Sequence, residues 1–422
     1  MRVAIVGAGY AGLRTAMLLE QHGVEVVVLE ARDRVGGRAE TVHVGGGFYE
    51  AGGEWIDADH HRCVSLLAEF GQKPEVSQQW PGTIVYQGEQ AAEDQPWPDA
   101  AADLEGIEKA AADLCRRMPA DLAADPEWRA LDDRSLAKWL DNQCSSRRGR
   151  WLAEAVYRSD EGEDTDRVGL LGWLQGYKHY LDREEGDMSA FRFPEGAQGL
   201  CDRMAGTLAS PVSFGWRLRS VEQGDDHVAL WSEGEVVVAD RAVLTMPPTC
   251  LRDIDFGPDP FAQQEAWSSV AGARAIKVAL RFTHAFWQGS SPRTIADLPF
   301  QQVWDGGRGG LPLLCCYICG NTAEAVARAH DPVRHVLRAV GEVFAQAQEA
   351  FVEGWLHDWV RDPWALGAYS CLAPGASRTR SILREPVGRV HLAGEGTADW
   401  IGFYEGALES AERVVQEVMD AG

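Results

Sequence analysis

Three glycines and one acidic residue near the N-terminus have the spacing of a nucleotide-binding turn. Gly7, Gly9 and Gly12 follow an apolar run at residues 3–6, and Glu30 comes eighteen positions after the last of these glycines. In such a turn the first glycine permits a tight bend, the second lets the backbone approach a pyrophosphate, and the third lets a helix pack closely on a strand. A carboxylate at this offset binds the hydroxyls of a ribose. The pattern therefore predicts a dinucleotide site.

The elements needed to position that turn surround it in the sequence. Residues 2–6 have the composition of a strand buried on both faces, residues 13–22 are typical of a helix closed by Gly23, and residues 24–29 of a second strand. In the resulting βαβ unit, unpaired N–H groups at the start of the helix face the phosphates. We therefore predict an α/β fold containing a Rossmann-like domain.

A second glycine-rich turn lies close to the C-terminus. It follows a short apolar strand and precedes a helix with an apolar stripe, formed by Ala407, Leu408, Ala411, Val414, Val415 and Val418. The start of this helix again offers N–H donors and positive electrostatic potential. Two such sites predict a long ligand that carries two negative charges.

Composition limits the class of protein. The chain has 422 residues and a formal charge of −24. This length predicts two interleaved domains, and the charge argues against binding to nucleic acid or to anionic membranes. A strand at residue 2 leaves no room for a signal peptide, and no run of about 18 apolar residues could span a bilayer. We therefore expect a cytoplasmic protein, and the sequence leaves its oligomeric state open, a homodimer included.

The cysteines and histidines do not form a metal site by their spacing. Nine cysteines are scattered along the chain, and the single CxxC, Cys316 to Cys319, lies in an apolar run that favours a buried strand. His60 and His61 lack the spacing of metal ligands, and we expect them at a solvated helix start. No metal is predicted.

Changes in composition and in hydrophobic periodicity along the chain indicate where it passes from one domain to the other. Residues 88–166 are rich in Ala, Asp and Glu and contain amphipathic segments such as 104–118, which predicts a helical insertion. The charge run SDEGEDTD at 159–166 favours a solvated loop or helix start. We assign the nucleotide-binding domain to 1–75, 191–270 and 386–422, and a substrate-binding α+β domain to 76–190 and 271–385.

Several motifs together resemble those of the flavin-containing monoamine oxidase family. They are the GxGxxG turn with Glu30, the Gly36-Gly37-Arg38 triplet, GGEWI at 52–56, HLAGEGTADWIGFYEGALESAERV at 391–414, and the lysine of AIKVALRF at 275–282. The two ends of the chain carry the most specific matches. Shorter pieces, such as FRFPEGAQGL and WVRDPWALGAY, extend the resemblance through the middle.

The resemblance implies FAD in an extended conformation, with its ADP half on the first βαβ unit. It places Glu30 at the adenosine ribose, Arg38 at the pyrophosphate or flavin edge, and Leu218 near the adenine. Backbone N–H groups of Gly402 and Phe403 are expected to face the N1–C2=O edge of the flavin. The full set of cofactor-binding residues implied is Gly7, Gly9, Ala11, Gly12, Glu30, Ala31, Arg32, Gly37, Arg38, Gly53, Glu54, Trp55, Leu218, Gly394, Glu395, Gly402 and Phe403.

The resemblance also implies the residues that meet the substrate. Strand alternation places Lys277 on the face opposite Ile276 and Val278, and the matching family lysine holds a water at flavin N5 and assists the reaction with oxygen. Tyr369 and Phe403 match the two rings of an aromatic cage, and Trp55 matches a ring that lines the cavity. Ala368 stands where some members have the cysteine that binds flavin covalently, so we expect noncovalent FAD.

These observations predict an FAD-dependent oxidase that converts an amine to an imine and then a carbonyl, with O₂ reduced to hydrogen peroxide. An L-amino-acid oxidase needs a fixed cation for the substrate carboxylate, and Arg62 is the nearest candidate, although we expect it to pair with surface acids. A flavin desaturase of the same fold needs neither Lys277 nor the cage. A non-catalytic FAD-binding protein is the alternative from another class. The identity of the amine, and any role of Glu54 and Asp57 in its selection, are left open.

Overall fold

A four-stranded parallel sheet draws its strands from both ends and the middle of the chain. The computed structural model describes residues 1–77, 82–119, 122, 125–183, 187–257, 264–288 and 291–421. In spatial order the strands are β2 (Glu25–Leu29), β1 (Arg2–Val6), β13 (Arg241–Leu244) and β21 (Val390–Leu392). The predicted βαβ unit is confirmed, with its helix α1 at Tyr10–Gln21.

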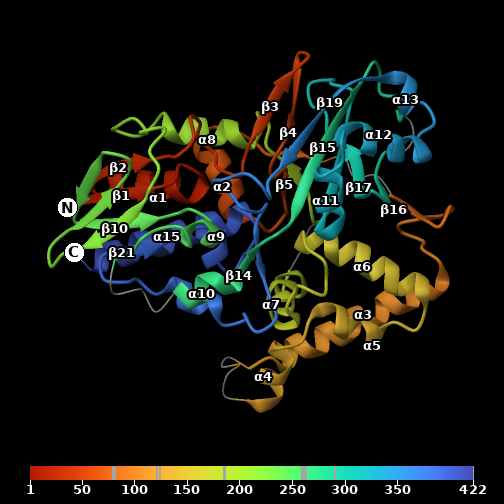
Figure 1. Cartoon of the computed structure of the whole chain (residues 1–422), viewed down its shortest axis with the longest axis horizontal. Helices are drawn as coiled ribbons and strands as arrows, with labels where there is room; N and C mark the ends of the chain where they lie inside the picture. Colours follow the sequence, from red (N-terminus) through yellow and green to blue (C-terminus); the bar gives the residue numbers. More distant parts are fainter. Residues whose placement is uncertain are drawn as a thin grey trace.

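Both faces of this sheet are covered, which explains the continuous apolar run in β1. Val3 and Ile5 pack toward a layer of helices, whereas Ala4 and Val6 pack toward a three-stranded antiparallel sheet, because successive strand residues point to opposite faces. The helical layer contains α1, α8 (Ala197–Ala205) and α15 (Tyr404–Asp420). The small sheet contains β10 (Ser220–Gln223), β11 (Val228–Trp231) and β12 (Val236–Ala239). Figure 1 shows this layered part on the left, with both chain ends beside it.

A seven-stranded mixed sheet forms the second part of the molecule. Its order is β19 (Phe351–Asp358), β15 (Ala275–Phe282), β18 (Leu313–Cys319), β17 (Phe300–Asp305), β16 (Thr294–Leu298), β7 (Thr83–Tyr86) and β8 (Glu89–Ala92). Ile276 and Val278 of β15 pack in a core with the covering helices, which are α11 (Gly320–Ala327), α12 (Pro332–Val343) and α13 (Ala347–Ala350). Ala279 points to the other face and packs with Tyr49. The alternation predicted for this strand is confirmed.

The predicted helical insertion is a group of five helices with its own apolar core. These are α3 (Pro98–Arg117), α4 (Pro126–Asp132), α5 (Leu136–Gln143), α6 (Arg147–Glu161) and α7 (Leu170–Leu181). They gather below the seven-stranded sheet in Figure 1. The fold is therefore α/β with an interleaved α+β part that carries a helical insertion, as predicted. No helix within the described residues is long and apolar enough to cross a membrane.

Short elements connect the two larger sheets. They are β3 (Thr41–Val44), β4 (Gly47–Glu50), β5 (Trp55–Ile56), α2 (His61–Glu69), β6 (Glu75–Val76), β9 (Phe191–Arg192), α9 (Pro248–Leu251), α10 (Gln264–Ser269), β14 (Val270–Gly272), β20 (Ser370–Leu372), α14 (Thr379–Arg384) and the 3₁₀ turn η1 (Glu395–Thr397). The separate cores of the two sheets support the proposed division into two domains. The exact domain bounds stay a prediction.

The acidic run at 159–166 is not a solvated loop, and this prediction was wrong. Glu163, Asp164 and Thr165 are buried. These acids can be buried because Arg274, more than 100 residues further along the chain, lies 2.7 Å from Glu163 and 3.2 Å from Asp164. Only Asp160 and Asp166 of this run are exposed. Tertiary pairing with a distant arginine therefore makes burial of these acids tolerable.

Candidate active site

One deep cavity of about 1100 Å³ runs from the parallel sheet to the helical insertion. Every residue predicted to bind cofactor or substrate lines it, with the exception of Gly12. Gly12 instead fulfils a packing role, because a Cβ atom there would lie 1.9 Å from the carbonyl oxygen of Gly7. Residues from three distant stretches of chain thus meet around a single elongated space.

Glu30 organises the end of the cavity beside β1 and β2. Its carboxylate accepts hydrogen bonds of 2.8 Å from the backbone N–H groups of Ala8 and Arg32. These bonds fix the carboxylate at the carboxyl edge of the parallel strands, where nucleotides bind in folds of this type. Leu218 and Ala31 line the same end, and Arg32 is oriented by an ion pair with Asp362 at 2.7 Å.

Glu395 joins the two glycine-rich turns at the middle of the cavity. Its carboxylate lies 2.7 Å from Arg38 and accepts hydrogen bonds from the backbone and hydroxyl of Ser370. It also accepts a 2.7 Å hydrogen bond from the N–H of Gly402. The N–H of Phe403 donates to the carbonyl of Trp400. These two N–H groups therefore have acceptors in the protein, which differs from their predicted orientation toward the flavin edge.

Lys277 is a buried cation that leaves β15 on the face opposite the apolar core. Its Nζ lies 3.1 Å from Glu54 Oε2 and donates to the carbonyls of Gly52 and Glu50 at 2.9 and 3.2 Å. Only 7 % of its surface is exposed, yet it borders the cavity. The end of the cavity at Glu30 is called the nucleotide end, and the end at Tyr369 and Phe403 is called the substrate end. Lys277 therefore provides a fixed positive charge between the two ends.

One of the two backbone carbonyls that accept from Lys277 belongs to Glu50, whose side chain is titratable. Burial raises the pKa of Glu50 to about 7, and its side chain accepts from the N–H of Ala197 and the hydroxyl of Thr41. Because the pKa is higher in the folded state, the contribution of Glu50 to stability falls as pH rises from about 4.5 to 7.

We predict that Glu50→Gln removes this pH dependence. The difference between the two free energies of unfolding, wild type minus E50Q, should fall by about 3 kcal/mol as the pH rises from 4.5 to 8. Denaturant titration of both proteins at several pH values measures this difference. Glu25→Gln, at an exposed strand position, is the control, and an E50Q difference that does not change with pH would contradict the prediction.

Tyr369 and Phe403 border the substrate end without direct ring contact between them. The Tyr369 hydroxyl donates to the carbonyl of Asp160 at 3.0 Å and lies 2.8 Å from the Tyr317 hydroxyl. Phe403 is held by edge contacts of its ring with His60 and Trp400, at centroid distances of 5.0 and 5.8 Å. Both side chains are thus held by contacts with the protein, and both border the cavity.

Trp55 lies beneath a cation that the sequence did not single out. The guanidinium of Arg192 lies 3.9 Å from the centre of the Trp55 ring and forms a 3.2 Å ion pair with Glu54. Trp304 also donates to Glu54. Glu54 therefore has Lys277, Arg192 and Trp304 as partners. Likewise Asp57 pairs with Arg183 at 3.0 Å, so neither acid named in the sequence is unpaired.

His60 is buried, and the prediction that it lies at a solvated helix start was wrong for this residue. It is 1 % exposed, accepts from the N–H of Asp57, and packs behind Phe403. Asp57, Asp59 and His60 have ligand atoms within 4.8 Å of one another. Arg183 already forms ion pairs with both carboxylates, which leaves less negative charge for a metal ion.

Arg62, the candidate cation for an amino-acid carboxylate, forms ion pairs with two glutamates outside the cavity. It pairs with Glu405 at 3.2 Å and Glu412 at 2.8 Å and does not line the cavity. The prediction that it pairs with acids is confirmed, although Glu405 is buried and not on the surface. This arrangement does not support a role for Arg62 in substrate binding.

The residues fit an extended dinucleotide flavin. Gly9 and Gly37 line the cavity where a side chain would narrow it, the Glu30 carboxylate is fixed beside the first glycine-rich turn, and the helix α15 points its N-terminus into the same space. A fold of this kind with a buried lysine and aromatic walls defines a flavin-dependent oxidoreductase.

The chain belongs to the flavin containing amine oxidoreductase family, whose sequence profile matches residues 10–419. It is 26 % identical to the flavin-containing amine oxidase A of Canis lupus familiaris, over 99 % of this chain and 85 % of that protein. Among solved structures, wild-type putrescine oxidase bound to putrescine has a TM-score of 0.89 at 25 % identity, with 100 % and 99 % of the two chains covered.

Cyclohexylamine oxidase from Brevibacterium oxydans IH-35A also has a TM-score of 0.89 at 25 % identity, again over 100 % of this chain and 99 % of its own. These similarities confirm the predicted family, the flavin-binding α/β fold and the oxidoreductase class. The protein is an FAD-dependent amine oxidoreductase that acts on a small-molecule amine.

Proposed function

We propose that the protein is an oxidase with noncovalently bound FAD, which oxidises an amine and passes the electrons to O₂. The observation that carries this proposal is the single cavity that connects Glu30 and both glycine-rich turns with Lys277, Tyr369 and Phe403. For a primary amine the overall reaction is amine plus O₂ plus water, giving a carbonyl compound, ammonia and hydrogen peroxide.

The nucleotide end would hold the ADP half of the cofactor. Glu30 would accept hydrogen bonds from the ribose hydroxyls, Gly9 would let the backbone approach the pyrophosphate, and Arg38 would balance part of its charge. Glu395 keeps Arg38 in place through their 2.7 Å ion pair. Because Gly402 and Phe403 have protein acceptors, we assign stabilisation of negative charge at the flavin to the N-terminus of α15, which begins at Tyr404.

The substrate end would orient a neutral amine. Tyr369 and Phe403 would hold it between their rings and exclude water from the carbon that reacts. The bound cofactor supplies the redox chemistry, in which the Cα–H leaves as a hydride equivalent and water hydrolyses the resulting imine. Trp55 and its stacked Arg192 would close one wall of this space.

Lys277 would act in the second half of the reaction. Its ammonium group is held by Glu54 and two carbonyls, so its position is fixed before oxygen arrives. A preorganised cation stabilises the negative charge that develops on oxygen as it accepts electrons. All three N–H donors of Lys277 have protein acceptors, so Lys277 would hold a water molecule only by exchanging one of these acceptors for it.

Anaerobic mixing of the purified holoprotein with amines, followed by oxygen, tests the proposed function. Loss of flavin absorbance with an amine and its return with oxygen, together with peroxide release, is expected. Bleaching by amino acids alone would indicate an amino-acid oxidase, and bleaching without reoxidation by oxygen would indicate a dehydrogenase. No bleaching with amines or amino acids would favour a desaturase or a non-catalytic flavoprotein.

Acid precipitation tests noncovalent attachment. Ala368 lines the cavity beside Tyr369 and has no sulfur to bond to flavin. We predict that all of the FAD absorbance appears in the supernatant after precipitation with trichloroacetic acid. The control is free FAD added to an unrelated protein, and yellow colour that stays with the pellet would contradict the prediction.

A further inference from the structure

Two acidic side chains at the C-terminal end of α6 have no partner among the residues that the structure describes. Asp160 and Glu161 line the cavity, and neither carboxylate forms an ion pair or hydrogen bond with any other described residue. The residues outside the described ranges include no lysine or arginine. An ordinary protein cation therefore does not account for these two charges.

The buried and half-buried acids nearest to them, Glu154, Glu163 and Asp164, are all paired. Glu154 lies 2.9 Å from Arg150 and Asp164 lies 2.9 Å from Arg158. Glu163 is paired with Arg274. The sequence therefore supplies an arginine for each buried acid that serves packing, and leaves Asp160 and Glu161 without one.

Tyr369 holds the C-terminal end of α6 beside the substrate end. Its hydroxyl donates to the carbonyls of Ser159 and Asp160 at 3.3 and 3.0 Å. The helix ends at Glu161 and is capped by Gly162, which has a left-handed backbone with φ of +63°, and a Cβ at Gly162 would lie 2.6 Å from the Tyr369 hydroxyl. The C-terminus of a 15-residue helix adds further negative potential at this point.

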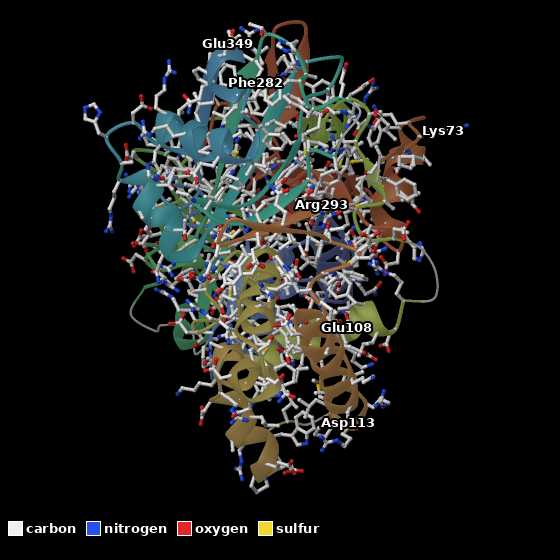
Figure 2. The ribbon with its side chains drawn as sticks, turned by 90° about the vertical axis from the view of Figure 1, so that its right-hand side faces the viewer. Lys73, Glu108, Asp113, Phe282, Arg293 and Glu349 are labelled. Atoms are coloured by element: carbon white, nitrogen blue, oxygen red, sulfur yellow. The ribbon has the colours of Figure 1, made fainter. Side chains whose placement is uncertain are left out.

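The cations that line this part of the cavity do not neutralise the two acids. Lys277 and Arg192 pair with Glu54, Arg293 with Glu93, and Arg308 with Glu75. Figure 2 labels Arg293 near the middle of the molecule and Glu108, a further acid of the cavity wall, below it on α3. The unpaired charge in this region is therefore negative.

The surrounding protein makes that negative charge costly while no cation is present, although Asp160 is exposed to the cavity and Glu161 is half-buried beside it. Desolvation by this surrounding protein raises the pKa of Asp160 to about 7 and that of Glu161 to about 8. The nearby charge of Asp57 also raises the pKa of Asp160, whereas Arg293 lowers it. A cationic ligand would offset the desolvation of both carboxylates, and a neutral apolar ligand would increase it.

We infer that the preferred substrate carries a second, protonated amino group, which Asp160 and Glu161 bind while the neutral reacting amine lies between Tyr369 and Phe403. This inference rests on the proposed function and names a substrate class for it, that of aliphatic diamines and longer aminoalkyl amines. It assigns the acidic selection to these two residues rather than to Glu54 and Asp57. An amino acid is disfavoured because its carboxylate would face the same two acids.

Paired substrates of equal length test this inference. Diaminobutane and pentylamine differ only in that an ammonium group replaces a methyl group at the remote end. In the wild-type holoenzyme we expect kcat/KM for diaminobutane to exceed that for pentylamine. In Asp160→Asn/Glu161→Gln the ratio of the two values should fall ~30-fold, which is the usual minimum cost of removing one partner from a desolvated charge pair. Glu108→Gln, at an acid of the same wall that is more exposed than Glu161, should change the ratio less than 3-fold, roughly the scale of a screened charge.

A binding measurement provides a readout independent of turnover. Diaminobutane added without oxygen should raise the Tm of wild-type holoenzyme more than pentylamine does, and the double variant should lose this difference. The single variants D160N and E161Q serve if the double variant does not fold. An unchanged substrate ratio in the variants, or a wild-type preference for pentylamine, would overturn the inference while leaving amine oxidation in place. Absence of flavin reduction by any amine would instead overturn the proposed function.

Discussion

Lys277→Met is expected to slow reoxidation of the reduced flavin by oxygen roughly 1000-fold, the upper range for loss of one preorganised electrostatic contact. The variant should still bind FAD, because Lys277 lies at the junction of the cavity and contacts Glu54 and two backbone carbonyls rather than the Glu30 end. Reduction of the flavin by amine should change much less. Stopped-flow absorbance separates the two half-reactions, and the FAD content of the purified variant checks cofactor binding.

Removal of Lys277 leaves Glu54 with Arg192 and Trp304 as partners, so effects of the carboxylate must be separated from those of the lysine. Lys277→Met/Glu54→Gln serves this purpose, since it removes both charges of the pair. Lys277→Arg retains the positive charge and should recover part of the oxygen reaction. If K277M reoxidises at the wild-type rate, Lys277 has no part in the chemistry, and its burial serves only to fix the turn at Gly52.

Arg274→Met is expected to lower the free energy of unfolding by about 4 kcal/mol, the cost of breaking a buried ion pair by removing one partner. Arg274 contacts Glu163 and Asp164 of the helical insertion and Glu324 of α11. It immediately precedes β15, so one guanidinium connects the insertion with the seven-stranded sheet. Without it, Glu163 is buried with no cation closer than Arg167 at 3.8 Å.

Denaturant unfolding of the holoprotein at neutral pH measures this loss, and Arg167→Met is the matched control. Arg167 is also an arginine beside Glu163, but its side chain is 56 % exposed and the ion pair is long, at 3.8 Å. Its removal should therefore cost less than about 1 kcal/mol. The deficit of R274M should shrink as pH falls, because burial raises the pKa of Asp164 and protonation of this carboxylate removes its need for a cation. Equal losses in R274M and R167M would show that the network is not stabilising.

Much of the nucleotide end was predictable because its signals are local. Gly7 has a φ of +108°, and a Cβ at Gly12 would lie 1.9 Å from the carbonyl oxygen of Gly7, so the turn and helix themselves require both glycines, whereas a Cβ at Gly9 would meet no atom closer than 3.6 Å. Lys277 could be placed on the correct face because strand alternation depends on a period of two residues. Each of these features is encoded within about ten residues of chain.

The substrate end could not be predicted in the same way, since its charges are balanced by residues far away in the sequence. The run at 159–166 is acidic throughout, yet Glu163 and Asp164 pair with Arg274, while Asp160 and Glu161 have no ion-pair partner in the described part of the chain. Glu54, which the sequence offered for substrate selection, is occupied by Lys277 and Arg192. Identical carboxylates thus have different roles according to which cations the fold brings within reach.

The sequence by itself determined the family, the flavin and the βαβ unit that binds it, because glycine conformation, strand period and helix-terminus electrostatics act over short stretches. Only the tertiary structure decided which acids have an ion-pair partner among the described residues, how Tyr369 and Phe403 are supported, and that Glu395 pairs with Arg38, 357 positions away. The physical reason is that desolvation and ion pairing depend on the complete surroundings of a side chain. Those surroundings here come from segments more than 100 residues apart, as in the 110 residues that separate Asp164 from Arg274.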